Sequence, residues 1–177
     1  IKQAFEEIYK APFIAKILLA ELGVKPERNL FLSINYDGNF EENQGWAALG
    51  ATASVQGRMR RYVESQPAFA QASLAQAVEL ALCTWAVGSL AQAASESTAA
   101  ESSSTQASEE KTEGDGSSLP DKAALLAHVR QTVAEKSLEC VLLERRGPGS
   151  AKYRALRPEE QGRLLPSAAS APATTYY

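Results

Sequence analysis

An alternating stretch near the start of the chain limits the possible folds more than any other feature of the sequence. Its apolar residues occupy every second position, with Ser33 and Asn35 between them: Leu30, Leu32, Ile34 and Tyr36. A period of two predicts a β-strand with one buried face. The Asp37-Gly38 pair that follows is a strong hairpin signal, because a tight turn needs a positive φ that glycine adopts cheaply. The next apolar run, Trp46 to Leu49, predicts the returning strand, which ends at Gly50.

Such a hairpin fits any antiparallel sheet, so its flanking elements decide the fold class. Residues 1–10 predict the end of a helix, closed before a proline, because the residue before proline avoids the α region. Residues 13–22 have the length and apolar character of a strand covered on both faces. Residues 138–146 and 152–156 predict a second hairpin, which turns at 147–149.

Two helices are expected in the middle of the chain. Residues 55–65 predict a short helix with one apolar face, formed by Met59, Tyr62 and Val63. Ser73 and Gln76 form a capping-box pattern, in which each side chain bonds the backbone N–H of the other. The helix that they begin is expected to end at about Ala94 and to bury one stripe: Leu74, Val78, Leu82 and Trp85.

Two further helices are expected in the last third. Residues 118–121 carry an N-terminal cap signature for the first, whose stripe consists of Leu125, Val129 and Val133. Pro158 suits the first position of the second helix, and Glu159 and Glu160 suit the positive end of its dipole. Consecutive strands followed by consecutive helices predict the α+β class, with helices layered on an antiparallel sheet.

Residues 95–118 contain no large apolar side chain, and we expect a disordered acidic insertion there. Its Asp115-Gly116-Ser117-Ser118 run is compatible with a catalytic or metal loop, but a composition that cannot order itself favours a solvated linker. Residues 167–177 are expected to form a disordered tail.

The charge pattern bears on possible partners. The 177 residues carry a net charge of −3, which argues against a nucleic-acid partner. A small basic cluster interleaves with Tyr62 at helical spacing, and this pattern favours a solvated or subunit-facing helix edge over a phosphate track. We therefore name four residues as a possible subunit interface: Arg58, Arg60, Arg61 and Tyr62.

The cysteines and the histidine give no sign of a metal, a cofactor or a catalytic residue. Cys83 and Cys140 stand singly in apolar runs without CxxC spacing, which fits free thiols in a reducing cytosol. His128 is the only histidine and is expected to flank a helix stripe, because neither a nucleophile nor an orienting acid can be assigned to it. We expect a cytoplasmic protein without a signal peptide, and no membrane span.

In this order the elements resemble the C-terminal portion of a proteasome α-type subunit of the actinobacterial kind. The similarity covers most of the chain apart from the insertion and the tail, and the succession of motifs is more specific than any one of them. The matching segments are Ala4–Pro12, Phe13–Leu22, Ile34–Gly38, Trp46–Gly50, Leu74–Trp85, Leu138–Arg145 and Tyr153–Leu156.

The resemblance implies an N-terminal-nucleophile hydrolase fold, a four-layer αββα sandwich whose N-terminal half is missing here. Residues 1–166 would then be the C-terminal part of a single proteasome-subunit domain. It also implies a non-catalytic subunit of the outer heptameric ring, which gates substrate entry and docks a regulatory ring ATPase. The partners would be other α-type subunits, the β-type subunits that cut peptide bonds, and protein substrates.

The chain itself is expected to be non-catalytic within a threonine-type endopeptidase complex. That chemistry needs an N-terminal Thr whose own amino group serves as the base, and Ile1 is not that Thr. The resemblance also implies a Gly-Ser-Gly run in β-type subunits where this chain has Gly50-Ala51-Thr52. A catalytic β-type or related peptidase is the first alternative, and an unrelated α+β binding domain is the second. Thr175-Tyr176-Tyr177 partly resembles the C-terminal tripeptide of docking ATPases but lacks its hydrophobic residue.

Overall fold

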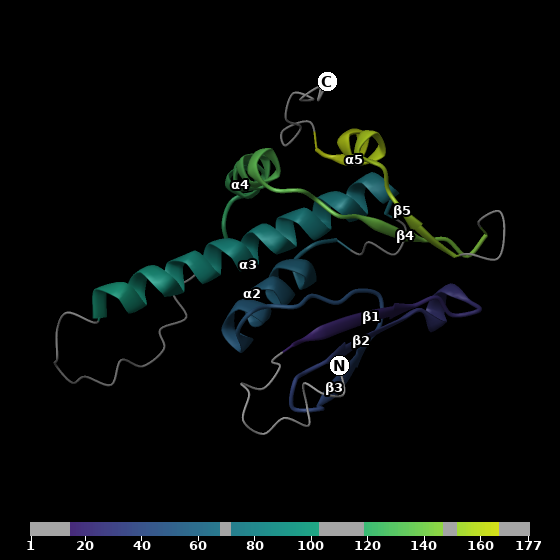
Figure 1. Ribbon diagram of the computed structural model, residues 1–177, viewed down its shortest axis with the longest axis horizontal. Coiled ribbons are helices and arrows are strands. Elements are labelled where there is room, and N and C mark those ends of the chain that lie inside the picture. The colour runs from purple at the N-terminus through teal and green to yellow at the C-terminus, as the bar shows by residue number, and fades with distance from the viewer. Residues whose placement is uncertain (1–14, 68–71, 103–118, 147–151, 167–177) are drawn as a thin grey trace, which may run out of the picture. The chain divides into compact units, whose positions relative to one another are not determined.

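The computed structural model describes residues 15–67, 72–102, 119–146 and 152–166. Within them the chain is a mixture of helices and two small antiparallel sheets (Figure 1), which confirms the expected α+β class. The expected helix at 1–10, the turn at 147–149 and the tail at 167–177 lie outside the described residues. The chain divides into two compact units: Ile1–Leu49 with Leu143–Tyr153, and Gly50–Leu142 with Arg154–Tyr177.

The first unit contains a three-stranded antiparallel sheet in the order β1-β2-β3. Its strands are β1 (Ile17–Glu21), β2 (Leu30–Ile34) and β3 (Phe40–Asn43), and the short 3-10 helix η1 (Pro26–Arg28) lies between the first two. Ile34 of β2 pairs with Ile17 on one side and with Phe40 on the other. Directly opposed residues share a face of a sheet, so the apolar residues of alternate positions gather on one face: Ile17, Leu19, Leu30, Leu32, Ile34 and Phe40.

The turn between β2 and β3 lies where the sequence predicts it. The amide of Asn35 donates to the carbonyl of Asn39 at 2.8 Å, and the amide of Gly38 donates back to Asn35 at 3.0 Å. Gly38 has a φ of 85°, the conformation for which glycine was expected. The predicted returning strand at Trp46–Leu49 is wrong, because the turn closes at Asn39 and pairing resumes at the next residue. The strand that returns is β3, whose residues are mostly polar.

The expectation that β1 is covered on both sides is also wrong. Ile17 and Leu19 are 48% and 49% exposed, and no residue of β1, β2 or β3 is fully buried. Because β1 is apolar at nearly every position, its sequence does not show which face is covered. A second hairpin is formed by β4 (Val141–Leu143) and β5 (Tyr153–Ala155), and Arg145, which follows β4, also belongs to this unit. The Arg145 guanidinium donates to the Gly23 carbonyl at 3.0 Å and to the Asn29 side-chain oxygen at 2.5 Å.

The second unit begins with α2 (Ala53–Glu64), which follows the expected pattern closely. Thr52 caps it, since its hydroxyl oxygen accepts a hydrogen bond from the Val55 amide at 3.2 Å. The predicted buried residues are confirmed, and Val55 joins them: Val55, Met59, Tyr62 and Val63.

The long helix α3 (Leu74–Ser102) begins with the predicted capping box. The Gln76 amide donates to the Ser73 hydroxyl at 3.3 Å, and the Ser73 amide donates to the Gln76 side chain at 2.9 Å. The predicted end at about Ala94 is wrong, because α3 continues through the first part of the expected insertion. A hydrogen bond of 2.9 Å from Gln92 to Glu96 spans that boundary, and alanine and glutamate propagate a helix well. Residues 103–118 lie outside the described residues.

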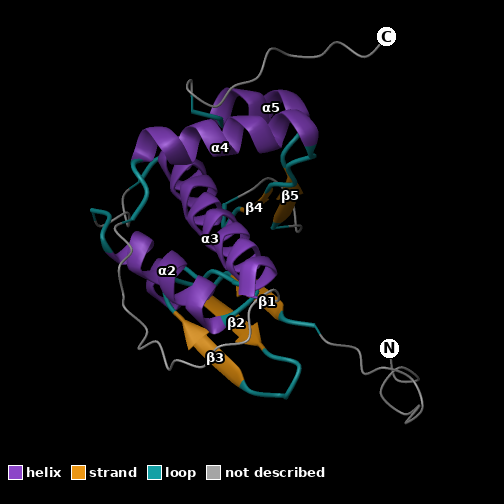
Figure 2. Ribbon diagram, turned by 90° about the vertical axis from the view of Figure 1, so that its left-hand side faces the viewer, coloured by secondary structure: helices purple, strands orange, loops and turns teal. Residues whose placement is uncertain are grey.

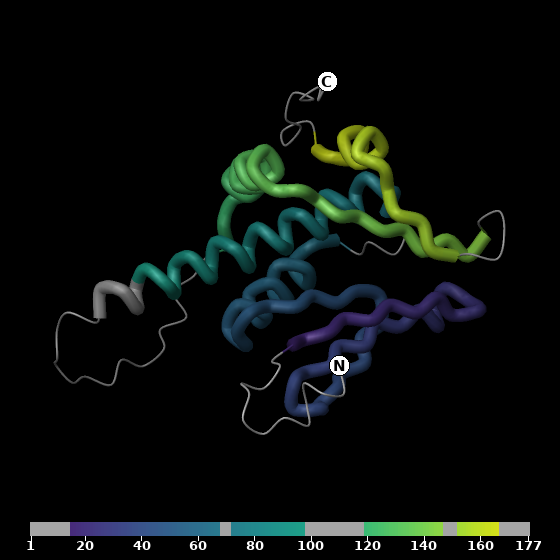
Figure 3. Tube along the Cα trace, in the orientation of Figure 1, coloured from purple at the N-terminus to yellow at the C-terminus, as the bar shows by residue number. Residues whose placement is uncertain are grey.

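The core of the second unit surrounds α3. The helix α3 packs against α2, α4 (Lys122–Glu135) and α5 (Pro158–Leu164). Figure 2 shows α3 running between α2 and the other two helices. An ion pair between Glu79 and Lys122 also joins α3 to α4. Figure 3 traces α3 and the helices around it as a tube along the backbone. The buried residues of the core are Tyr62, Leu82, Cys83, Ala86, Val87, Leu125 and Val129.

The strands of the second hairpin are shorter than predicted. They are β4 (Val141–Leu143) and β5 (Tyr153–Ala155), and their pairing is extended by backbone hydrogen bonds of 2.8 Å from Leu156 to Cys140 and from Glu144 to Lys152. Pro158 occupies the first turn of α5, as its position in the sequence predicts.

Candidate functional site

The second unit carries an apolar groove of about 500 Å³ beside α3. Three segments line it: one face of α3, the last turns of α4, and the stretch that leads from α4 into β4. This volume lies within the usual range for sites that hold a small molecule or an inserted side chain. The lining residues are Val78, Ala81, Leu82, Trp85, Val129, Thr132, Val133, Lys136, Ser137, Leu138, Glu139 and Cys140.

The groove exists because α3 is apolar on two faces. One face is buried against the neighbouring helices: Leu82, Cys83, Ala86 and Val87. The predicted stripe is therefore only partly correct, since Leu82 is in the core while Leu74 and Trp85 are 39% and 40% exposed. Leu74, Val78, Ala81 and Trp85 follow one another at helical spacing, so they form a second apolar face that the chain leaves half uncovered.

The double apolar character of α3 also affects the expectation about membranes. By length and composition alone, Leu74–Ser97 is long and apolar enough to cross a bilayer, so the expectation that the chain has no such segment was wrong. A core helix passes the same test, and α3 has the contacts of a core helix on one of its faces.

The aromatic side chain at the groove is held by a residue from α4. The rings of Trp85 and His128 are stacked, with centroids 5.5 Å apart and planes inclined by 13°. His128 Nε2 lies 3.0 Å from the Ser89 hydroxyl oxygen. His128 thus joins α4 to α3, which refines the expectation that it only flanks a stripe. Among the described residues no carboxylate bonds its other nitrogen, so the pair is a packing contact and not a triad.

The edge of the groove carries one cation and one anion. Lys136 and Glu139 both line it, and both residues are exposed. In the described part of the chain neither side chain has an ion-pair partner or a hydrogen bond. The groove therefore has an apolar floor and a rim that bears both signs of charge.

The predicted subunit-interface residues lie on α2, which does not line the groove. Arg60 and Arg61 are exposed and Arg58 is half-buried, so their role in an interface stays a prediction. Tyr62 is only 7% exposed and belongs to the core cluster, so its ring packs inside the second unit, and its role in an interface stays a prediction. Burial, together with the neighbouring Cys83 thiol, raises the pKa of its phenol well above the ordinary value.

The two cysteines are unpaired, as predicted, but their surroundings differ. Cys83 is 1% exposed, and burial raises the pKa of its thiol. Cys140 is only half-buried and lines the groove. Nothing in its sequence context indicates a groove, because the face of α3 that completes the lining lies far earlier in the chain.

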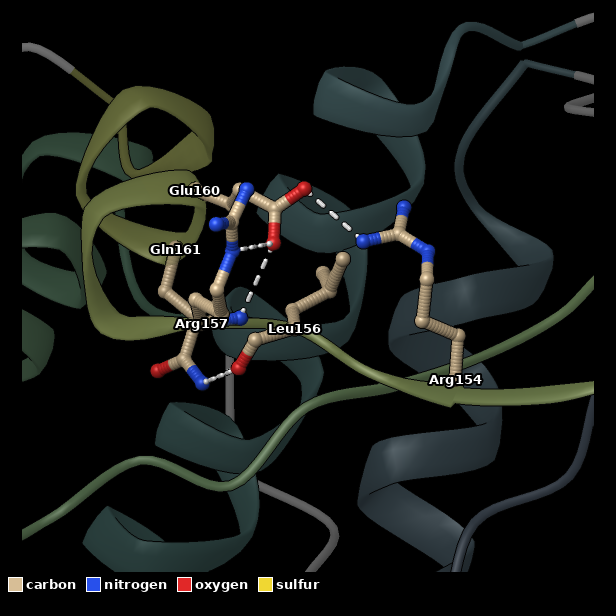
Figure 4. Close-up of polar contacts among 5 residues, drawn as sticks. All are labelled: Arg154, Leu156, Arg157, Glu160 and Gln161. Carbon is tan, nitrogen blue, oxygen red and sulfur yellow. Dashed lines mark hydrogen bonds and ion pairs between the residues drawn. The ribbon is translucent and has the colours of Figure 1, made fainter.

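A polar cluster fixes the start of α5 (Figure 4). The Glu160 carboxylate accepts from the Arg157 amide at 3.1 Å, from the Arg154 guanidinium at 2.8 Å and from the Arg157 guanidinium at 3.2 Å. Gln161 bonds the Leu156 carbonyl at 2.7 Å beside it. The Arg157 amide, followed by the two guanidiniums, lowers the pKa of Glu160 from 4.5 to about 2. Both oxygens of this carboxylate accept hydrogen bonds within the cluster, which indicates a structural role.

The described residues contain no group of three or more His, Cys, Asp or Glu side chains that could hold a metal ion. No protein-family model, no curated protein and no solved structure matches this chain. Among the described residues the groove and its rim are the candidate functional site, and they offer an apolar hollow with charges of both signs at its edge.

Proposed function

We propose that this chain is a non-catalytic α-type subunit of a bacterial proteasome core particle. It would occupy the outer heptameric ring in the cytoplasm, contact α-type and β-type neighbours, gate the entry of protein substrates and dock a regulatory ring ATPase. The observation that carries the proposal is the order of the elements: an antiparallel sheet, a short capped helix, a long helix, a further helix, a hairpin and a short last helix. The succession that the resemblance implies is similar, apart from the strand expected at Trp46–Gly50.

The junction before α2 supports this assignment. A Cβ atom on Gly50 would lie 2.6 Å from the Gln56 backbone nitrogen, so only glycine fits where the chain enters the helix. Ala51 follows it and has no hydroxyl group, and Thr52 uses its hydroxyl to cap α2. The resemblance implies a serine at position 51 in catalytic subunits. The alanine at this position therefore favours the α type over the β type.

The exposed sheet also supports the proposal. One face of β1, β2 and β3 gathers apolar side chains, and three of its residues are about half exposed or more: Ile17 48%, Leu19 49% and Phe40 68%. In a four-layer αββα sandwich a second sheet packs against such a face. We therefore propose that this surface is covered by the remainder of an N-terminal-nucleophile hydrolase fold.

The test is co-expression of the full-length gene product with a β-type gene product from the same organism, followed by negative-stain microscopy. Four stacked seven-fold rings are the expected result. Dispersed particles without rings, from a soluble mixture that contains both chains, would remove the proteasome assignment.

A peptidase assay on the same material separates the α type from the catalytic alternative. Replacing the N-terminal Thr of the β-type partner with Ala should abolish cleavage of a peptide substrate and leave the rings intact. Cleavage that persists in that variant would place the nucleophile on this chain.

A further inference from the structure

We propose that the groove beside α3 binds a second copy of this chain through a two-fold contact. The inference depends on the surface of the second unit alone, and it does not require the ring assembly proposed above. Three features carry it: the half-exposed indole of Trp85, the apolar floor beside it and the mixed charges on its rim.

The half-exposed indole and the hollow belong to one patch. Trp85 lines the groove and yet is 40% exposed, and its stacking on His128 restrains the ring. A two-fold interface places the same patch of each copy against the other, so each indole can enter the groove of its partner. Restrained aromatic side chains in apolar hollows are the usual anchors of such interfaces.

The charges on the rim can pair with those of a second copy, because the rim carries one cation and one anion. Lys136 and Glu139 are both exposed, and no ion pair joins either of them to another described residue. When a two-fold axis brings two such rims together, Lys136 of each copy can face Glu139 of the other. A strongly acidic or strongly basic partner would gain from one of these charges and be repelled by the other.

A charge-swap experiment tests this pairing with the full chain. Lys136→Glu makes the rim wholly acidic and Glu139→Lys makes it wholly basic, so each variant should repel its own copies. Sedimentation velocity across a range of concentrations should show self-association of the wild type, and association weakened at least about tenfold in each single variant. An equimolar mixture of the two variants should recover association, because opposite rims then meet.

A cross-link supplies the second measurement. Cys140 lies in the groove, whereas the Cys83 thiol is buried. A short bis-maleimide should therefore give a covalent dimer of the wild type and none of Cys140→Ser. Trp85→Ala should lose both the cross-link and the association, and far-ultraviolet circular dichroism will show whether the variant keeps its helices.

Several results would overturn the proposal. One such result is a wild type that stays monomeric at every concentration. Saturable binding of an apolar dye to that monomer would assign the groove to a small ligand. Self-association that Lys136→Glu, Glu139→Lys and Trp85→Ala all leave unchanged would place the contact elsewhere on the chain. A mixture that associates no better than the single variants would exclude the two-fold charge pairing.

Discussion

Among single residues, Val129 makes one of the clearest contributions to stability. Its side chain is 0% exposed, at the contact of α4 with α3. Val129→Ala removes two buried methyl groups and leaves a cavity, so we expect the free energy of unfolding to fall by about 2 kcal/mol or more. Val141→Ala is the matched control, because Val141 is 46% exposed and should cost about half as much or less. Urea unfolding followed by tryptophan fluorescence measures both, and equal losses would contradict the burial of Val129.

The single residue Glu160 should make the stability of the fold depend on pH. Its carboxyl pKa is lowered from 4.5 to about 2 by the Arg157 amide, the Arg154 guanidinium and the Arg157 guanidinium. A carboxyl group whose pKa is lower in the folded state stabilises the fold above its unfolded pKa, and this stabilisation is lost as the pH falls through the folded pKa. The wild type should therefore be more stable than Glu160→Gln near neutral pH, and the difference should shrink between about pH 5 and pH 2.

Thermal unfolding at a series of pH values measures that difference. Glu159→Gln is the control, since it removes the same charge from the preceding position of α5 and leaves the cluster in place. A difference between the wild type and Glu160→Gln that stayed constant from neutral pH to pH 2 would show that the cluster does not hold the carboxylate ionised.

Among the helices, the start of α2 depends on one hydroxyl group. Thr52 accepts from the Val55 amide at 3.2 Å, and this satisfies one of the backbone donors that a helix leaves free at its start. Thr52→Ala should lower the free energy of unfolding by about 0.5–2 kcal/mol. Thr52→Ser keeps the oxygen and should be close to the wild type. If both variants were equally destabilised, the methyl group and not the cap would be responsible.

The elements that could be predicted from the sequence are those with a local signal. The cap at Ser73, the buried face of α2 and the first turn of α5 depend on residues within a few positions of each other, and the structure confirms all three. The end of α3 could not be predicted because serine, alanine and glutamate suit both a linker and a helix. Its predicted stripe was only partly correct, since a helix that is apolar on two faces has no single periodic signal.

The groove could not be predicted for a different reason. It forms where α3, the end of α4 and the stretch before β4 meet, and only tertiary contacts bring these segments together. The sequence placed Trp85 on an apolar stripe, but nothing local indicates that the stripe stays half uncovered. The returning strand was misplaced for a related reason: β3 is mostly polar, and its position follows from the length of the turn before it.

For the whole molecule, the two units differ in how much they bury. The second unit has a core of buried side chains from α2, α3 and α4. In the first unit no residue of β1, β2 or β3 is fully buried, and the apolar face that the strands share is half exposed. Since the free energy of local opening rises with the apolar surface that an element buries, the sheet should open far more readily than the helices.

Hydrogen exchange followed by mass spectrometry tests this difference in the isolated chain. Peptides that cover β1, β2 and β3 should exchange early, and peptides from the core turns of α3 and from α4 should exchange last. Equal protection of the sheet and the helices would show that the sheet is already covered in the isolated chain. The same measurement bears on the proposed function: assembly with a β-type partner should slow exchange in the sheet if the sandwich is completed there. Slowed exchange confined to α3 and the 136–140 segment, and growing with chain concentration, would instead report the copy-to-copy contact at the groove.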